Sequence, residues 1–160
     1  MHIIQKISLI VARVSEILAG IIIGILTLVL LAQVILRTFF KSGIAWSVEF
    51  SIFAIIWAVM LIGNVLIKNN EMITVDFFDT FFSEKFIKYR DIVYQVIFVF
   101  LMILMVYFGF IQSINGLKMN TATLQIKWFY PYLAIPVGMA LMLFQYIVKI
   151  IENLLRKDVT

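Results

Sequence analysis

Side chains that could do chemistry are scarce in this sequence. It contains no cysteine, which excludes disulfides, thiolate catalysis and thiolate-bound metal clusters. Its single histidine, His2, stands at the N-terminus, whereas a metal or haem site needs several converging donors. The densest group of polar residues contains Arg37, Lys41, Trp46 and Glu49. We therefore expect no metal and no cofactor, and we interpret the polar group as a candidate recognition surface.

The composition indicates a membrane protein. Hydrophobic residues make up 64% of the 160 residues and charged residues only 14%, with a mean hydropathy of +1.09. Four uncharged runs are long enough, or nearly so, for the ~20 helical residues that a hydrocarbon core requires: 17–36, 50–67, 92–117 and 128–148. We expect an all-α integral membrane protein with four transmembrane helices, in a single membrane domain over residues 1–160. The remaining segments are too short for a water-soluble domain, which excludes an enzyme that works in water.

Two segments outside the runs are amphipathic. In residues 2–16, Ile3, Ile7, Ile10 and Val14 recur at helical spacing. In residues 71–91, apolar side chains form two adjacent columns with a spacing of four residues, which are Ile73, Phe77 and Phe81 beside Phe78, Phe82 and Phe86. Each segment is predicted to be an interfacial amphipathic helix that lies on membrane lipid or on neighbouring protein. The first could instead extend the first span.

Basic residues predict the orientation of the chain. With the N-terminus inside, nine lysines and arginines lie on the inner side, and four lie on the outer side: Arg37, Lys41, Lys118 and Lys127. The positive-inside rule therefore predicts that both termini face the cytoplasm. The basic residues are scattered along the membrane edges without forming a stripe, so the net charge of +4 does not indicate a nucleic acid partner.

The interior of the predicted spans lacks the chemistry of a transport path. Every Asp, Glu, Lys and Arg lies outside the four runs, whereas a protein that moves a polar solute alone needs polar groups or broken helices at membrane depth. A small four-helix multidrug-type exporter would need an intramembrane carboxylate and is the nearest alternative. A membrane anchor subunit of a respiratory enzyme is a second alternative. We expect an accessory membrane subunit rather than a complete permeation pathway.

Five different short motifs follow one another along the chain. They are residues 37–40, 44–50 (followed by Trp57 and Gly63), 73–76, 121–126 and 132–138. In order and spacing, from Gln33 to Val148, they resemble the small membrane subunit of tripartite ATP-independent periplasmic (TRAP) transporters. Ala45 stands where that family usually has proline, and Val48 replaces the first of two adjacent acids.

The resemblance implies a multi-pass protein of the bacterial inner membrane with two protein partners. A periplasmic substrate-binding protein would capture an organic acid such as a dicarboxylate or sialic acid. A large membrane subunit would carry the solute and sodium sites, so that a sodium gradient would be used by that partner. The small subunit would act as a scaffold for the large one and would not be an enzyme.

Two pairs of residues are candidates for contact with such partners. Gly20 and Gly24 lie four residues apart in the first run and would allow close approach of another helix, from this chain or from a partner. Trp46 and Glu49 would share one face at a helix start, near Arg37 and Lys41. Their simpler interpretation is that Trp46 anchors in the headgroup region and the acid favours its own helix end.

Overall fold

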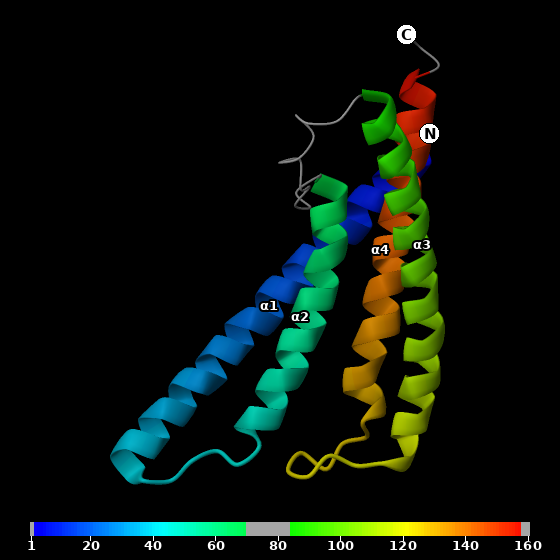
Figure 1. The fold of residues 1–160 in the computed structure, drawn as a ribbon. Coiled ribbons are helices and arrows are strands. Elements are labelled where there is room, and N and C mark those ends of the chain that lie inside the picture. The colour runs from blue at the N-terminus through cyan, green and yellow to red at the C-terminus, as the bar shows by residue number, and fades with distance from the viewer. Residues whose placement is uncertain (1, 70–83, 158–160) are drawn as a thin grey trace.

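The computed structural model describes residues 2–69 and 84–157 as an all-helical protein (Figure 1). Its elements are α1 (His2–Phe40), α2 (Ser47–Asn69), α3 (Glu84–Asn115), the short 3₁₀ helix η2 (Gly116–Lys118) and α4 (Phe129–Lys157). Within the described residues, four helices are long and apolar enough to cross a membrane. The prediction of an all-α protein with four membrane-spanning helices is therefore confirmed.

The four long helices form a row rather than a closed bundle. α1 packs along α2, α2 along α4, and α4 along α3, and only the N-terminal part of α1 also reaches α4 (Figure 1). The two central helices accordingly bury 39% (α2) and 28% (α4) of their apolar spans, against 11% for α1 and 6% for α3. Most of the apolar surface of α1 and α3 is thus available to lipid or to another protein.

The amphipathic segment 2–16 is continuous with the first span. α1 runs for 39 residues without a break, which corresponds to ~58 Å at ~1.5 Å per residue and far exceeds a hydrocarbon core of ~30 Å. Of the two alternatives for this segment, the structure has the helical extension of the span. Of the segment 71–91, residues 71–83 lie outside the described part of the chain, and residues 84–91 form the first turns of α3.

Small residues bring the helices of the row together. On α1, the buried positions Ser8, Ala12, Ser15 and Ala19 recur every three or four residues and form one stripe. Between α2 and α4, a Cβ atom added at Gly138 would lie 2.5 Å from Met60 Cβ and 3.0 Å from the Met60 carbonyl oxygen. Only glycine fits there, because the obstacle includes the backbone of the neighbouring helix.

Both connections between packed helices lie at one end of the molecule, which we call the loop end, while the two termini lie at the other, the terminal end (Figure 1). At the loop end α1 stops where Lys41 adopts a left-handed conformation, with φ of 51°. The Ser42 N–H donates to the Leu36 carbonyl at 3.4 Å and so folds the chain back on the last turn of the helix. The Gln33 side-chain oxygen accepts the Ile44 N–H and fixes the following turn.

Candidate functional site at the loop end

The connection between α3 and α4 folds into a small hairpin, residues 119–128. The Thr121 N–H donates to the Ile126 carbonyl at 2.8 Å, and the Trp128 N–H donates to the Met119 carbonyl at 3.1 Å. The Thr121 hydroxyl oxygen, which is buried, accepts the Ile126 N–H at 3.2 Å. The two arms of the hairpin are therefore held together by their own hydrogen bonds. The backbone N–H groups of its turn need an acceptor outside the hairpin.

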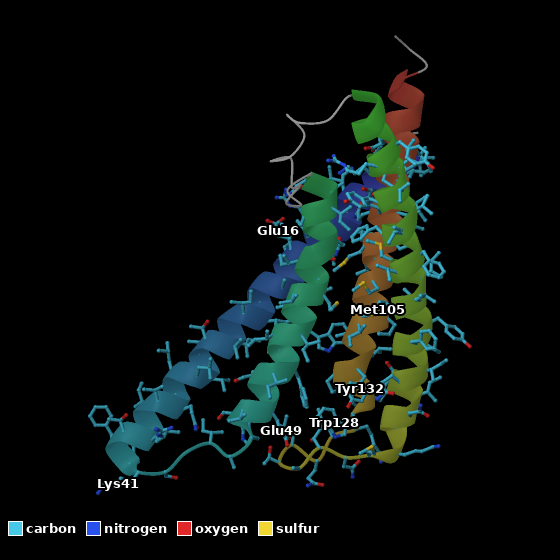
Figure 2. All side chains as sticks on the ribbon, viewed as in Figure 1. Glu16, Lys41, Glu49, Met105, Trp128 and Tyr132 are labelled. Atoms are coloured by element: carbon cyan, nitrogen blue, oxygen red, sulfur yellow. The ribbon has the colours of Figure 1, made fainter. Side chains whose placement is uncertain are left out.

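Glu49 supplies that bond from the first turn of α2. One carboxylate oxygen accepts the Thr123 N–H at 3.0 Å and the other accepts the Leu124 N–H at 2.9 Å. Successive backbone N–H groups in a turn form a concave anion site, and here a carboxylate of the same chain occupies it. Figure 2 shows Glu49 at the loop end of α2, beside the hairpin. The two helical connections are thereby joined through one side chain.

Aromatic residues support the same junction on the side of α4. Trp128 stacks on Tyr132 with ring centroids 5.2 Å apart, and it meets the Phe53 ring edge-on at 5.6 Å (Figure 2). The Trp57 indole N–H donates to the Tyr130 carbonyl at 3.2 Å. Because Phe53 and Trp57 belong to α2, these contacts fix the start of α4 against α2. The hairpin, which leads into α4, is held in place with it.

Trp46 and Glu49, predicted to share one face, have different neighbours. Trp46 precedes α2, where its carbonyl accepts the Phe50 N–H at 3.0 Å and its ring lies edge-on against Phe50 at 5.8 Å. Trp46 as a whole residue remains 39% exposed, whereas both Glu49 oxygens are bonded to the hairpin. Trp46 is thus the member of the pair with free surface, and Glu49 acts within the chain.

The cationic residues of the loop end are all exposed. Arg37 lies in the last turn of α1 and Lys118 ends η2, two positions that the helix dipole favours for cations. Lys41 follows α1 and Lys127 lies in the hairpin, bridged to Asn120. None of the four cations forms a salt bridge with a residue that the structure describes. Their side chains are available to a partner.

Gly20 and Gly24 lie on an exposed face of α1 and do not contribute to the packing of this chain. A Cβ atom added at either position would meet nothing within 4 Å, and both residues are exposed. The helices that the structure describes therefore do not use this pair, because α1 packs through the stripe that contains Ser15 and Ala19 instead. Contact with a helix of another protein remains a prediction for Gly20 and Gly24.

Polar groups inside the spans are few and mostly bonded. Ser113 donates to the Gly109 carbonyl at 2.7 Å, and Thr27 donates to the Ile23 carbonyl at 2.8 Å, each within its own helix. The buried Asn64 donates to the Leu61 carbonyl at 2.6 Å, while its Oδ1 has no partner among the described residues. No group of three His, Asp or Glu in the described part of the chain could hold a metal ion.

Sequence reasoning missed the residues that complete the loop end. The hairpin segment carried a family resemblance, yet no residue type in it indicated that its turn binds an acid. The donors are the backbone N–H groups of Thr123 and Leu124, which any residue except proline possesses. The role of Gln33 was not indicated by the sequence either, because a glutamine near the end of an apolar run is typical of a solvated helix end.

Comparison with known proteins decides the family. Residues 26–156 match the family described as "Tripartite ATP-independent periplasmic transporters, DctQ component". The chain belongs to this family. It is therefore a multi-pass membrane component of a TRAP transporter, in a family that is not enzymatic.

A longer relative shows sequence similarity to most of the DctQ chain. The sialic acid TRAP transporter permease protein SiaT of Haemophilus influenzae (strain 86-028NP) is 27% identical over 138 residues. The matched region covers 84% of this chain and 22% of that permease. The DctQ chain thus spans about a fifth of the length of this relative, and most of the permease has no counterpart in it.

Proposed function

We propose that this DctQ chain is a non-transporting scaffold subunit, which supports a larger ion-coupled membrane subunit during uptake of an organic acid. A periplasmic binding protein delivers the acid in this proposal. The observation that carries it is the absence of any charged side chain from the four apolar runs, combined with the open row of helices. The chain offers much surface for a partner and little chemistry for a solute.

The hydrogen bonds of the chain favour the scaffold role over that of a proton-coupled exporter. A proton-coupled exporter of similar size would need a carboxylate at membrane depth that is free to exchange protons. The acid nearest to the spans at the loop end, Glu49, has both oxygens bonded to backbone N–H groups. Solute sites in secondary transporters commonly use broken helices, whereas α1, α2, α3 and α4 are each continuous over their described residues.

The length of the relative supports a division of labour. SiaT is named as a whole permease, and this chain matches about a fifth of it. We assign the transport path to a large membrane component equivalent to that remainder. The solute class, organic acids including sialic acid, follows from the name of this relative and from the family resemblance.

We place the chain in a bacterial inner membrane with both termini in the cytoplasm. The excess of basic residues at the terminal end, nine against four, supports this orientation. The loop end then faces the periplasm, where a soluble binding protein would arrive. A sodium gradient would act on the large subunit, because the runs of this chain contain no carboxylate to bind the ion.

Reconstitution tests the proposal. Liposomes carrying a sodium gradient receive this chain alone, the large subunit alone, or both, each with the binding protein and a labelled organic acid. We expect uptake only with both membrane subunits, and co-purification of the two from mild detergent. Solute uptake by this chain alone, or full uptake without it, would contradict the scaffold role.

A further inference from the structure

One exposed face of α1 alternates isoleucines with cations near the terminal end. Its members recur at a spacing of three or four residues and so lie along one side of the helix: Ile3, Lys6, Ile10, Arg13 and Ile17. All five are exposed, and the exposed fraction is 75% for Ile3 and 59% for Ile10. We call these five residues the α1 outer face, which is apolar and cationic at once.

The α1 outer face is turned away from the other helices. Each cation stands two residues before a buried serine, Lys6 before Ser8 and Arg13 before Ser15. Two residues correspond to ~200° around a helix, so both cations lie opposite the stripe through which α1 packs. Gln145 of α4 bonds to Ser8 twice and so fixes this rotation of α1. Neither Lys6 nor Arg13 forms a salt bridge with a described residue.

The length of α1 places this face at a membrane surface. The uncharged run 17–36 fills a hydrocarbon core by itself, because the core needs ~20 helical residues. Residues 3–16 continue the same helix for a further ~21 Å, whereas the headgroup layer on each side of the core is only ~5–8 Å thick. An upright α1 would carry Ile3 and Ile10 through that layer into water, which is unfavourable for apolar surface. A tilted α1 keeps them among the headgroups.

We propose that the α1 outer face binds an anionic phospholipid in the leaflet at the terminal end. Its isoleucines pack on the upper part of the acyl chains, while Lys6 and Arg13, ~10.5 Å apart along the helix axis, hold the phosphate. The one acid among residues 2–16, Glu16, forms no salt bridge with either cation, so the segment keeps a net positive charge. A zwitterionic headgroup neutralises its own phosphate, and an anionic lipid is therefore favoured. This inference rests neither on the scaffold role nor on the orientation.

The test compares two lipids that differ in headgroup charge. The full chain has no native cysteine, so Ile10→Cys carries a single fluorophore on the α1 outer face in phosphatidylcholine nanodiscs. Phosphatidylglycerol or phosphatidylcholine with a nitroxide near the headgroup is then added at increasing mole fraction, and quenching reports contact. We expect phosphatidylglycerol to reach half-maximal quenching at a roughly tenfold lower mole fraction. Equal curves for the two lipids overturn the proposal without any charge variant.

Charge variants in the same labelled chain locate the site. K6Q/R13Q should abolish the preference for phosphatidylglycerol, and both side chains are exposed, so no packing is lost. K6R/R13K keeps both charges and should keep the preference. The matched control is R37Q/K41Q, which removes the same charge at the loop end, also from exposed positions, and should change nothing. A preference that persists in K6Q/R13Q overturns the proposal, as does its loss in either of the other two variants.

Inorganic phosphate distinguishes a lipid site from a site for a free anion. Sodium phosphate and sodium chloride are compared at equal ionic strength, so that both screen the cations alike. We expect the same phosphatidylglycerol curve in both salts, because a free ion has no acyl chain to pack on the isoleucines of the α1 outer face. Displacement of the lipid by phosphate but not by chloride would mean that Lys6 and Arg13 bind free phosphate, which overturns the lipid site.

Discussion

Ser8 and Gln145 form a reciprocal pair of hydrogen bonds between α1 and α4. The Ser8 hydroxyl donates to Gln145 Oε1 at 2.6 Å, and the Gln145 amide donates to the Ser8 carbonyl at 2.9 Å. Both side chains are almost completely buried. The pair joins helices that are not neighbours in the row over most of their length, and it does so near the terminal end.

Removal of this pair should loosen α1 from α4. Ser8→Ala leaves the buried Gln145 side chain with an unsatisfied carbonyl oxygen, and we expect a loss of about 0.6–1.7 kcal/mol in unfolding free energy. Denaturant titration in detergent measures it. Ser113→Ala is the matched control, because that buried serine bonds only to its own helix. Equal losses for the two variants would show that the α1–α4 pair has no special role.

A second prediction concerns the close contact between α2 and α4 at Gly138. Gly138→Ala places a methyl group against the Met60 backbone, and such overpacking should cost about 1–3 kcal/mol, measured by the same titration. Gly20→Ala should cause no loss, because its methyl group enters open space and alanine favours a helix. Destabilisation by Gly20→Ala instead would mean that α1 packs through its other face.

The exposed glycine pair can be tested for partner contact. Gly20→Ile and Gly24→Ile should leave the isolated chain folded, since neither position has a neighbour within 4 Å. If a helix of the large subunit approaches there, the bulkier side chains should reduce its co-purification by several fold. Ile21→Leu, a conservative change on an exposed position of the same helix, serves as the control. Unchanged co-purification would mean that Gly20 and Gly24 face lipid and do not contact the large subunit.

The bond between Glu49 and the hairpin should appear in hydrogen exchange. Glu49→Gln replaces one acceptor oxygen with an amide, so the Thr123 and Leu124 N–H groups should exchange faster in a peptide covering residues 119–128. Glu16→Gln changes the same charge at a distant exposed site and should leave this peptide unaffected. Protection that is identical in both variants would mean that the carboxylate does not fix the turn.

Trp46 and Glu49 can be separated as contact candidates. Trp46→Ala should lower co-purification of the large subunit or uptake at limiting binding protein, because its ring is partly exposed and lies beside α2. Glu49→Ala should act through the hairpin and therefore change hydrogen exchange as well. The double variant should retain normal abundance in the membrane. Normal assembly and uptake in that variant would leave both residues with purely local roles.

The orientation can be measured directly because the chain has no native cysteine. A cysteine at Ser42, at the loop end, should react with a membrane-impermeant thiol reagent in intact cells, and one at Lys6 should be protected. Both positions are exposed, so accessibility within the protein does not bias the comparison. The reverse labelling pattern would mean that the terminal end faces the periplasm.

The presence of four long apolar helices could be predicted from the sequence because hydrophobic length alone indicates them. The packing face of α1 could not. That helix carries two sets of small residues, one with Gly20 and Gly24 and the other with Ser8, Ala12, Ser15 and Ala19, and spacing favours both. The structure buries the second set, whereas Gly20 and Gly24 are exposed. The partners of Glu49 could not be predicted for a different reason. They are backbone N–H groups, which no particular residue type indicates.

The row of helices also has a consequence for how the protein enters the membrane. α1 with α2, and α3 with α4, are each joined by a short connection and packed on one another, so each pair resembles a helical hairpin that can insert as a unit. The contacts between the pairs are the α2–α4 seam, the Ser8–Gln145 pair and the bonds of Glu49. Biogenesis can therefore proceed in two stages, with the first hairpin already in the bilayer while the ribosome is still making the second.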